Sequence, residues 1–280
     1  VGLVDGSNGA RDYVTQMMAE RFCGVVSSRN SDIPREPDMI FSWRFRISPD
    51  LEKHVRRGAV LVCFDLGYFD ENKYDNFSIS INGIHGQSMG VDGILDLPPR
   101  RHPRIWSWRS AGEFIQIISP GWLHDPTLRA AASELPAGWV IDTTGQAIAA
   151  FNRPVKVRHH PKGLPPGMSK IPPLATTFDE TYVSISYASN AAIQTILAGV
   201  PTVVQHPRCP AYEIASHTLA LSHPPGREAW AHRLSYRQYG MLQESEQKAA
   251  QEYIERGYAQ AKKKGPLLDP LGTYGIRREK

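Results

Sequence analysis

Apolar and polar positions alternate in blocks along the chain, and the blocks predict strands and helices in turn. Short apolar runs typical of strands occupy residues 1–4, 39–43 and 59–64, with polar, helix-favouring segments between them. The run at 59–64 is apolar without interruption, as in a parallel strand that is covered on both faces. Strands that alternate with helices predict an α/β fold built on a doubly wound, mostly parallel sheet.

The same alternation starts again after a proline-rich, basic stretch at residues 98–104, which places a domain boundary near residues 110–113. The elements expected beyond it are strands at 114–119, 139–142 and 154–159 and helices at 126–134, 143–150, 230–239 and 242–264. The expected parts of the chain are an N-terminal domain at 1–112, a second domain at 113–235, and a C-terminal helix and tail at 236–280.

The segment from Tyr182 to Val204 is the most regular part of this pattern. It predicts a buried strand, a polar turn, a short helix, a stop at Gly199 and a second buried strand. Ser189 and Asn190 stand where the helix begins, and both are good capping residues. Because a helix N-terminus offers unpaired N–H groups, this end can bind an anion such as a diphosphate. The alternative is an ordinary βαβ unit in which the cap only stabilises the helix.

Composition narrows the class of protein. Hydrophobic residues fill 41% of the 280 positions, enough for a globular core, yet no apolar run is long enough to cross a bilayer. The three cysteines, Cys23, Cys63 and Cys209, are odd in number and far apart. This spacing argues against a disulfide framework or a zinc site and favours a reducing, cytoplasmic compartment. The net charge of +4 is a mild bias, compatible with a polyanionic partner.

A cluster of cationic and imidazole groups ends the strand predicted at 154–159. Arg158, His159 and His160 come last, and Pro161 follows them. Open α/β sheets bind ligands at the carboxyl ends of their strands, so these side chains are candidate ligand contacts.

The His-Pro at the strand end, the Ser-Asn at the helix start and the Ala-Gly-Val-Pro at 198–201 together resemble the donor half of GT-B glycosyltransferases. More narrowly, they are similar to the capsule-polysaccharide and phage-encoded groups. The resemblance implies two Rossmann-like domains facing a cleft, a C-terminal helix crossing back, and a nucleotide-sugar donor, foremost a UDP-sugar. The donor-binding residues that follow from strand position and resemblance are Arg158, His160, Ser189, Asn190 and, for the ribose, Glu213.

A second strand end supplies a candidate base. Asp65 follows the run at 59–64, and inversion at a sugar carbon needs a base to take the proton of the attacking hydroxyl. The sequence Asp65-Leu-Gly-Tyr68 with a later Asn-Gly also resembles the phage group, in which an acidic-Gly-Tyr motif faces the sugar. The alternative is that Asp65 has no catalytic role and caps a turn, as aspartate after a strand often does. Asp5, which also follows a strand, is a rival base. The candidate acceptor- and sugar-binding residues are Asp5, Gly6, Tyr68, Asn82, Gly83 and His85.

Two stretches, residues 43–46 and 100–109, interleave arginines with aromatic residues. Guanidinium groups pair with phosphates, and exposed aromatic rings can stack on a base flipped out of a duplex. The alternative is a basic linker and a strand whose tryptophans face the core. The candidate nucleic-acid contacts are Arg44, Arg46, Arg100, Arg101, Arg104, Trp106 and Arg109.

These features favour an inverting, nucleotide-sugar-dependent glycosyltransferase that adds a sugar to a hydroxymethylated pyrimidine in double-stranded phage DNA, in the cytoplasm of an infected host. Two alternatives stay open: transfer to a surface or capsular glycan, and a non-catalytic nucleic-acid-binding protein on a GT-B scaffold. The chain has no clustered Asp-x-Asp, which disfavours a metal-bridged diphosphate site, and we expect no metal ligands. A loosely bound Mg²⁺ that aids the leaving group stays open.

Overall fold

The computed structural model describes residues 2–3, 9–22, 26–27, 36–43, 49–69, 76–83, 93–120, 138–159, 171–207, 209–240 and 242–266. The chain divides into two compact units. Unit 1 combines Val1–His102 with Ala231–Tyr274, and unit 2 holds Pro103–Trp230. The chain therefore leaves unit 1 after His102. It returns at Ala231, which lies inside the helix Arg227–Ser235.

Unit 1 is built on a six-stranded mixed sheet with the order β10-β5-β4-β3-β1-β2. Its strands are β1 (Gly2–Leu3), β2 (Val26–Ser27), β3 (Met39–Trp43), β4 (Val60–Leu66), β5 (Asn76–Ile81) and β10 (Gln238–Gly240). The pairs among β1 to β4 are parallel, as the alternation of strands and helices predicts. In contrast, β5 runs antiparallel to β4, and β10 runs antiparallel to β5.

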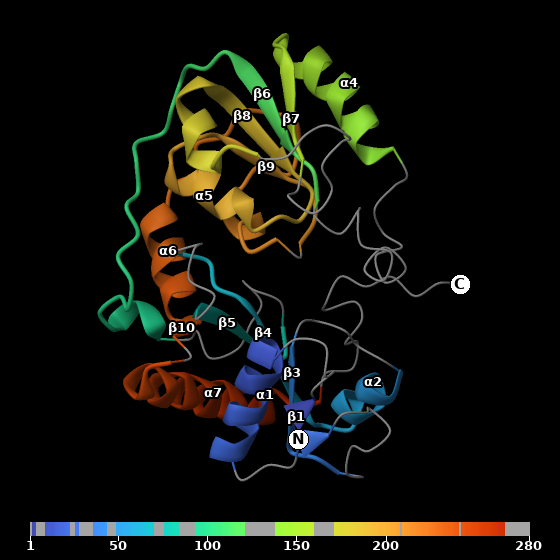
Figure 1. The fold of residues 1–280 in the computed structure, drawn as a ribbon, viewed down its shortest axis with the longest axis vertical. Coiled ribbons are helices and arrows are strands. Elements are labelled where there is room, and N and C mark those ends of the chain that lie inside the picture. Colours follow the sequence, from blue (N-terminus) through green and yellow to red (C-terminus); the bar gives the residue numbers. More distant parts are fainter. Residues whose placement is uncertain are drawn as a thin grey trace. The chain divides into compact units, whose positions relative to one another are not determined.

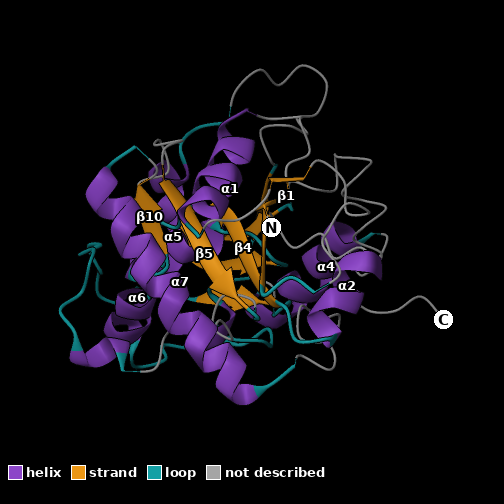
Figure 2. Ribbon diagram, turned by 90° about the horizontal axis from the view of Figure 1, so that it is seen from below, coloured by secondary structure: helices purple, strands orange, loops and turns teal. Residues whose placement is uncertain are grey.

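One face of this sheet carries the apolar core of unit 1. The register sets Phe64 opposite Ile79, and Leu66 opposite Phe77, so alternate residues of β4 and β5 point the same way. Phe64 and Phe77 meet edge to face with ring centroids 5.6 Å apart. Helices α1 (Gly9–Arg21) and α7 (Glu244–Lys264) cover this face, and Figure 2 shows α7 lying along β10, β5 and β4. Helix α2 (Pro49–Arg56) joins β3 to β4.

Unit 2 is built on a four-stranded parallel sheet with the order β7-β6-β8-β9. Its strands are β6 (Phe114–Ile118), β7 (Val155–Arg158), β8 (Thr181–Ser186) and β9 (Thr202–Val204). Its helices are α4 (Trp139–Phe151), α5 (Ala191–Leu197), the 3₁₀ turns η5 (Leu174–Glu180) and η6 (Tyr212–Ile214), and the first part of α6 (Arg227–Ser235). In Figure 1, α4 and α5 lie on opposite sides of the sheet.

The strand predicted at 139–142 is wrong, because the chain is helical from Trp139 onward. The buried residues of α4 are Trp139, Thr143 and Ala147, which are spaced by four and therefore share one helix face. That face packs on Ile115, Ile117 and their neighbours in the sheet, so tertiary contacts override the strand-like sequence Trp-Val-Ile. The helix predicted at 126–134 lies outside the described residues.

A strap of extended chain, residues 103–112, runs over the C-terminal end of α5 within unit 2. The N–H of Trp106 donates to the carbonyl of Leu197 at 2.8 Å, and the N–H of Arg109 donates to the carbonyl of Gly199 at 2.7 Å. The guanidinium of Arg227 donates to the carbonyls of Trp106 and Ile196. Gly199 has φ of 77°, and a Cβ there would overlap the carbonyl oxygen of Ser107, so only glycine fits.

Two features are absent from the described residues. None of their helices combines the length and the apolar character that a membrane crossing requires. Within the same residues, no three His, Cys, Asp or Glu side chains come together so as to hold a metal ion.

Candidate functional site

The strand order of unit 2 creates a switch point at the carboxyl edge of its sheet. Strand β6 lies between β7 and β8, so the connections that leave the neighbouring strands β6 and β8 pass to opposite sides of the sheet. Ligands of open α/β sheets bind at such points. Small polar residues end both strands here: Ser119 follows β6 and Ser186 ends β8, and both are buried.

Two serine side chains fix the turn between β8 and α5. The Oγ of Ser186 accepts the N–H of Ser189 at 3.0 Å, and the Oγ of Ser189 accepts the N–H of Ala191 at 3.2 Å. Helix α5 begins at Ala191, so the predicted helix start after Ser189 and Asn190 is confirmed. Asn190 makes no capping bond through its side chain. Binding of a diphosphate by these two residues stays a prediction.

An aromatic cluster covers the same edge next to β8 and β9. The rings of Tyr187 and His206 stack with centroids 4.9 Å apart. The indole Nε1 of Trp139 donates to Oε1 of Gln205 at 2.6 Å and so ties the start of α4 to the end of β9. Sequence reasoning missed His206 and Tyr187. The signal that could have found them is their place directly after predicted strands.

Cys209 ties the segment after β9 to the same turn. Its Sγ donates to the carbonyl oxygen of Ser189 at 3.3 Å. Burial raises the pKa of the Cys209 thiol from its ordinary value of 9.0 to about 12. The thiol is therefore an inert structural group at neutral pH.

Because the pKa of the Cys209 thiol is raised by burial, we expect the folded protein to lose stability at alkaline pH. The thiol's pKa is raised in the folded state, so its contribution is complete below pH 9 and is lost as the pH rises toward 12. At pH 10 the loss is about 1 kcal/mol. Urea unfolding at pH 8 and pH 10 measures it, and the Cys209→Ala variant is expected to lose less stability than the wild type by that amount. Equal losses in both proteins would contradict the assignment.

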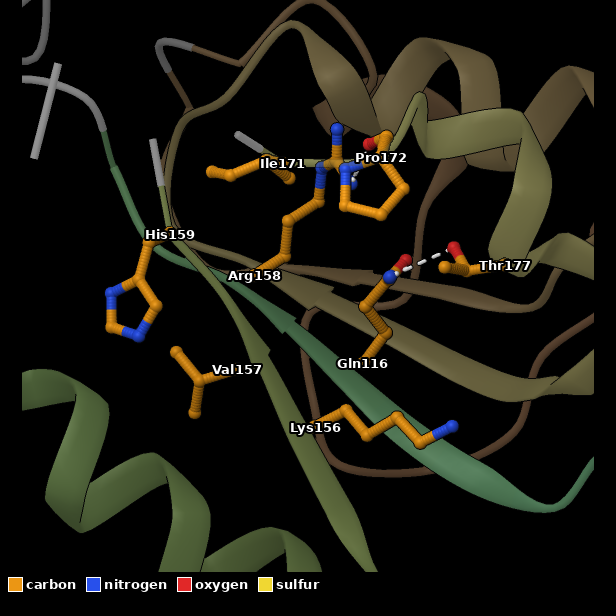
Figure 3. Close-up of a pocket in the computed structure, with 8 residues that line it drawn as sticks. All are labelled: Gln116, Lys156, Val157, Arg158, His159, Ile171, Pro172 and Thr177. Carbon is orange, nitrogen blue, oxygen red and sulfur yellow. Dashed lines mark hydrogen bonds between the residues drawn. The ribbon is translucent and has the colours of Figure 1, made fainter. Parts of the chain in front are cut away.

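A pocket of about 200 Å³ opens at the β7 side of the sheet (Figure 3). It is lined by Gln116, Lys156, Val157, Arg158, His159, Ile171, Pro172 and Thr177. Arg158 is the last residue of β7, and its Nη1 donates to the carbonyl of Pro172 at 2.8 Å. The strand end predicted to bind ligand thus contributes both Arg158 and His159 to a real pocket, whereas His160 lies outside the described residues.

In unit 1, Asp65 is the penultimate residue of β4 and is half-buried. Its Oδ1 accepts the N–H of Leu66 at 2.8 Å, so the carboxylate does cap the local backbone. The turn that follows is clamped by Gln238, whose Oε1 accepts the N–H groups of Tyr68 and Phe69, both at 2.6 Å. A clamped turn of this kind holds Asp65 and Tyr68 in a fixed relation.

Tyr68 is buried, and burial raises the pKa of its phenol from 10.0 to about 12. The positive charge of Arg237 and a hydrogen bond with Ser78 oppose that rise, whereas the negative charge of Asp65 adds to it. Asp65, Tyr68, Ser78 and Arg237 therefore form one electrostatically connected cluster. Sequence reasoning placed residues 230–239 on one helix, but α6 ends at Ser235 and β10 begins at Gln238, so Gln238 is on the sheet and Arg237 directly precedes it.

Asn82 and Gly83 are not brought together with that cluster. Asn82 follows β5, and its Oδ1 accepts the N–H of Leu61 at 2.8 Å, near the start of β4. Four residues of strand, about 13 Å, separate Leu61 from Asp65. Asn82 is also buried at φ of 44°, a left-handed conformation that asparagine tolerates. These observations give Asn82 a structural role, and its binding of sugar or acceptor stays a prediction.

Four arginines of the predicted nucleic-acid surface lie in the described part of the chain, and three of them form ion pairs within it. Arg100 and Arg101 both pair with Glu246, at 2.9 and 2.7 Å, and Arg109 pairs with Asp179 at 2.7 Å. Arg104 lies over the ring of Trp106 at 3.6 Å from its centroid, and 47% of Trp106 is exposed. The Arg104–Trp106 pair therefore keeps the exposed cation and ring that stacking on a base requires.

The remaining candidates divide in two. Glu213 is exposed in η6, after β9, and its contact with a ribose stays a prediction. The others lie outside the described residues: Asp5, Gly6, Arg44, Arg46, His85 and His160.

Comparison with known proteins finds no match among protein-family models and none among curated proteins. Among solved structures, the chain is similar to KpsC, beta Kdo 2,7 transferase, of Thermosulfurimonas dismutans. The similarity has a TM-score of 0.48 and 11% sequence identity, and covers 86% of this chain and 95% of that one.

Proposed function

We propose that the chain is a nucleotide-sugar-dependent, inverting glycosyltransferase of GT-B type whose unit 2 binds the donor. The observation that carries the proposal is the carboxyl edge of the unit 2 sheet. A switch point, two buried serines and a stacked Tyr187–His206 pair lie along this edge, and the Arg158 pocket opens at the β7 side of the same sheet. A cation and hydroxyl groups suit a phosphate, while the aromatic pair and the pocket suit the less polar parts of a nucleotide.

The chemistry that we propose needs one base. The acceptor hydroxyl attacks the anomeric carbon, the bond from that carbon to the diphosphate oxygen breaks, and the configuration inverts. The hydroxyl proton passes to the carboxylate of Asp65, and the nucleoside diphosphate leaves with the electron pair of the broken bond. The fixed turn held by Gln238 supports this role for Asp65, because a general base must be held in position.

For the acceptor we propose a hydroxymethylated pyrimidine in double-stranded DNA. The exposed Arg104–Trp106 pair supports it, since such a pair can stack on a flipped base beside a phosphate. The proposed donor is a UDP-sugar, and transfer to a surface or capsular glycan is the alternative that the acceptor assay includes.

The donor is tested by thermal unfolding against a panel of nucleotide sugars and free nucleotides. One donor is expected to raise Tm, since a ligand at a hundred times its Kd adds about 2.7 kcal/mol. Arg158→Gln is expected to lose that shift. Arg153→Gln is the matched control, because Arg153 lies before β7, over the ring of Tyr182, at the other end of the strand. A panel with no shift would overturn the donor assignment and favour a non-catalytic protein.

The acceptor is tested with the donor found in that panel. Mass spectrometry would follow transfer to hydroxymethylated duplex DNA, to unmodified duplex DNA and to capsular oligosaccharides. Transfer to the hydroxymethylated duplex alone is the expected result. Transfer to the oligosaccharides alone would contradict the DNA acceptor and leave the glycosyltransferase assignment in place.

A further inference from the structure

Gln116 is an unusual residue for its position. It lies in the middle of β6, an inner strand of a parallel sheet, and only 2% of it is exposed. Inner strands of parallel sheets are covered on both faces and are normally apolar throughout. A buried amide that lacks a hydrogen-bond partner costs free energy, so its presence here needs a reason.

The orientation of this amide follows from its neighbour Thr177. The hydroxyl of Thr177 donates to the carbonyl of Leu174 at 2.8 Å, so its oxygen can only accept from Gln116. The Nε2 of Gln116 therefore donates to Thr177, at 2.9 Å (Figure 3), which leaves Oε1 as the atom of the amide that Thr177 does not bind. Among the described residues Oε1 is buried and has no hydrogen-bond partner.

The pocket that Gln116 lines indicates what kind of ligand it could bind. Gln116 lines the 200 Å³ pocket, whose wall includes the apolar side chains of Ile171 and Pro172. Ser184, opposite Gln116 on β8, is a second buried side chain whose hydroxyl has no hydrogen-bond partner within the described part of the chain. Pockets for whole drug-sized ligands measure about 300–1,000 Å³, so this one suits a single ring rather than a whole nucleotide sugar.

Arg158, at the cationic end of the pocket, is close enough to Gln116 for one ligand to reach both residues. The strand register sets Lys156 opposite Gln116 and Arg158 opposite Ile118. Arg158 is therefore about 7 Å further along the strand direction, toward the carboxyl edge. A ligand with a flat ring at Gln116 and an anionic group near Arg158 would match this arrangement.

We propose that this pocket binds the nucleobase of the donor, with Oε1 of Gln116 accepting an N–H of the base edge. The inference rests on the proposed function and deepens it. The ring lies between the apolar wall and the sheet, and the phosphates extend toward Arg158. The Nε2 of Gln116 keeps one N–H for a carbonyl or ring nitrogen beside that donor, which is the pairing that side-chain amides make with bases.

The test compares a nucleotide with two probes on two proteins. The ligands are the nucleoside monophosphate that binds the wild type, its analogue with the base N–H methylated (N3-methyl for uridine), and ribose 5-phosphate. Calorimetry gives Kd for each with the wild type and with Gln116→Met, which keeps the side-chain length and removes the hydrogen bonds. Methylation is expected to weaken binding to the wild type at least tenfold and to change binding to Gln116→Met little.

Each outcome supports or overturns the assignment of Gln116 to the nucleobase. Ribose 5-phosphate is expected to bind both proteins equally, which shows that Gln116→Met is folded and that the phosphate end is intact. If methylation leaves wild-type binding unchanged, Gln116 holds a buried water instead, and the inference fails while the donor assignment stands. If no nucleotide binds the wild type at all, the donor assignment and the inference fail together. The methylated ligand needs no mutant, so poor folding of Gln116→Met does not remove the test.

Discussion

The Asp65→Asn variant is expected to transfer sugar about 10²–10⁴-fold more slowly than the wild type, with donor binding unchanged. Asparagine has nearly the same shape, and its amide oxygen can still accept the N–H of Leu66 that Asp65 accepts at 2.8 Å. The substitution therefore keeps the local fold and removes only the group that takes the proton. Initial rates at saturating donor and acceptor measure the effect, and Tm checks the fold.

Asp96→Asn is the matched control for this variant. Asp96 is an exposed carboxylate in the short 3₁₀ turn Ile94–Asp96 of the same unit, and its substitution is expected to leave the rate unchanged. Full activity in Asp65→Asn would mean that Asp65 serves only as a backbone cap. The rival base Asp5 would then be the residue to replace.

Local chemistry explains which parts of the fold could be predicted from the sequence. The helix start after Ser189 and Asn190 depends on residues next to one another in the chain, and it is confirmed at Ala191. The strand β5 is not among the predicted strands, although its alternation places Phe77, Ile79 and Ile81 on the core face. Its partner β10 comes from residue 238 onward, and no local signal reveals such a distant antiparallel pairing.

In the candidate site too, some residues could be found from local sequence and others depend on contacts between distant parts of the chain. Arg158 and Asp65 could be found because each ends an apolar run, and strand ends are where ligands bind. The Tyr187–His206 stack and the amide oxygen of Gln116, which has no hydrogen-bond partner among the described residues, depend on the order of strands in the sheet. Gln116 stands out in the sequence only as one polar residue within an apolar strand, and such a residue could equally face solvent.

The Arg237→Met variant is expected to raise the free energy of unfolding, by about 1–4 kcal/mol. Arg237 is fully buried, and within the described residues its Nε, Nη1 and Nη2 have no hydrogen-bond partner. A buried charge whose donors lack hydrogen-bond partners keeps most of its desolvation cost, and methionine fills similar space without that cost. The strand pairing is unaffected, because Ile79 donates to the main-chain carbonyl of Arg237.

Arg227→Met is the matched control, because it removes a buried arginine whose hydrogen bonds are made. Its guanidinium donates to the carbonyls of Trp106 and Ile196 and lies over the ring of Trp108 at 3.8 Å. Removing it leaves two carbonyls unpaired, so stability is expected to fall by about 2–4 kcal/mol. Urea unfolding of both variants should therefore give changes of opposite sign. A loss in Arg237→Met as large as that in Arg227→Met would mean that the charge of Arg237 is compensated in solution, and Asp65, a member of the same cluster, would be the candidate counter-charge.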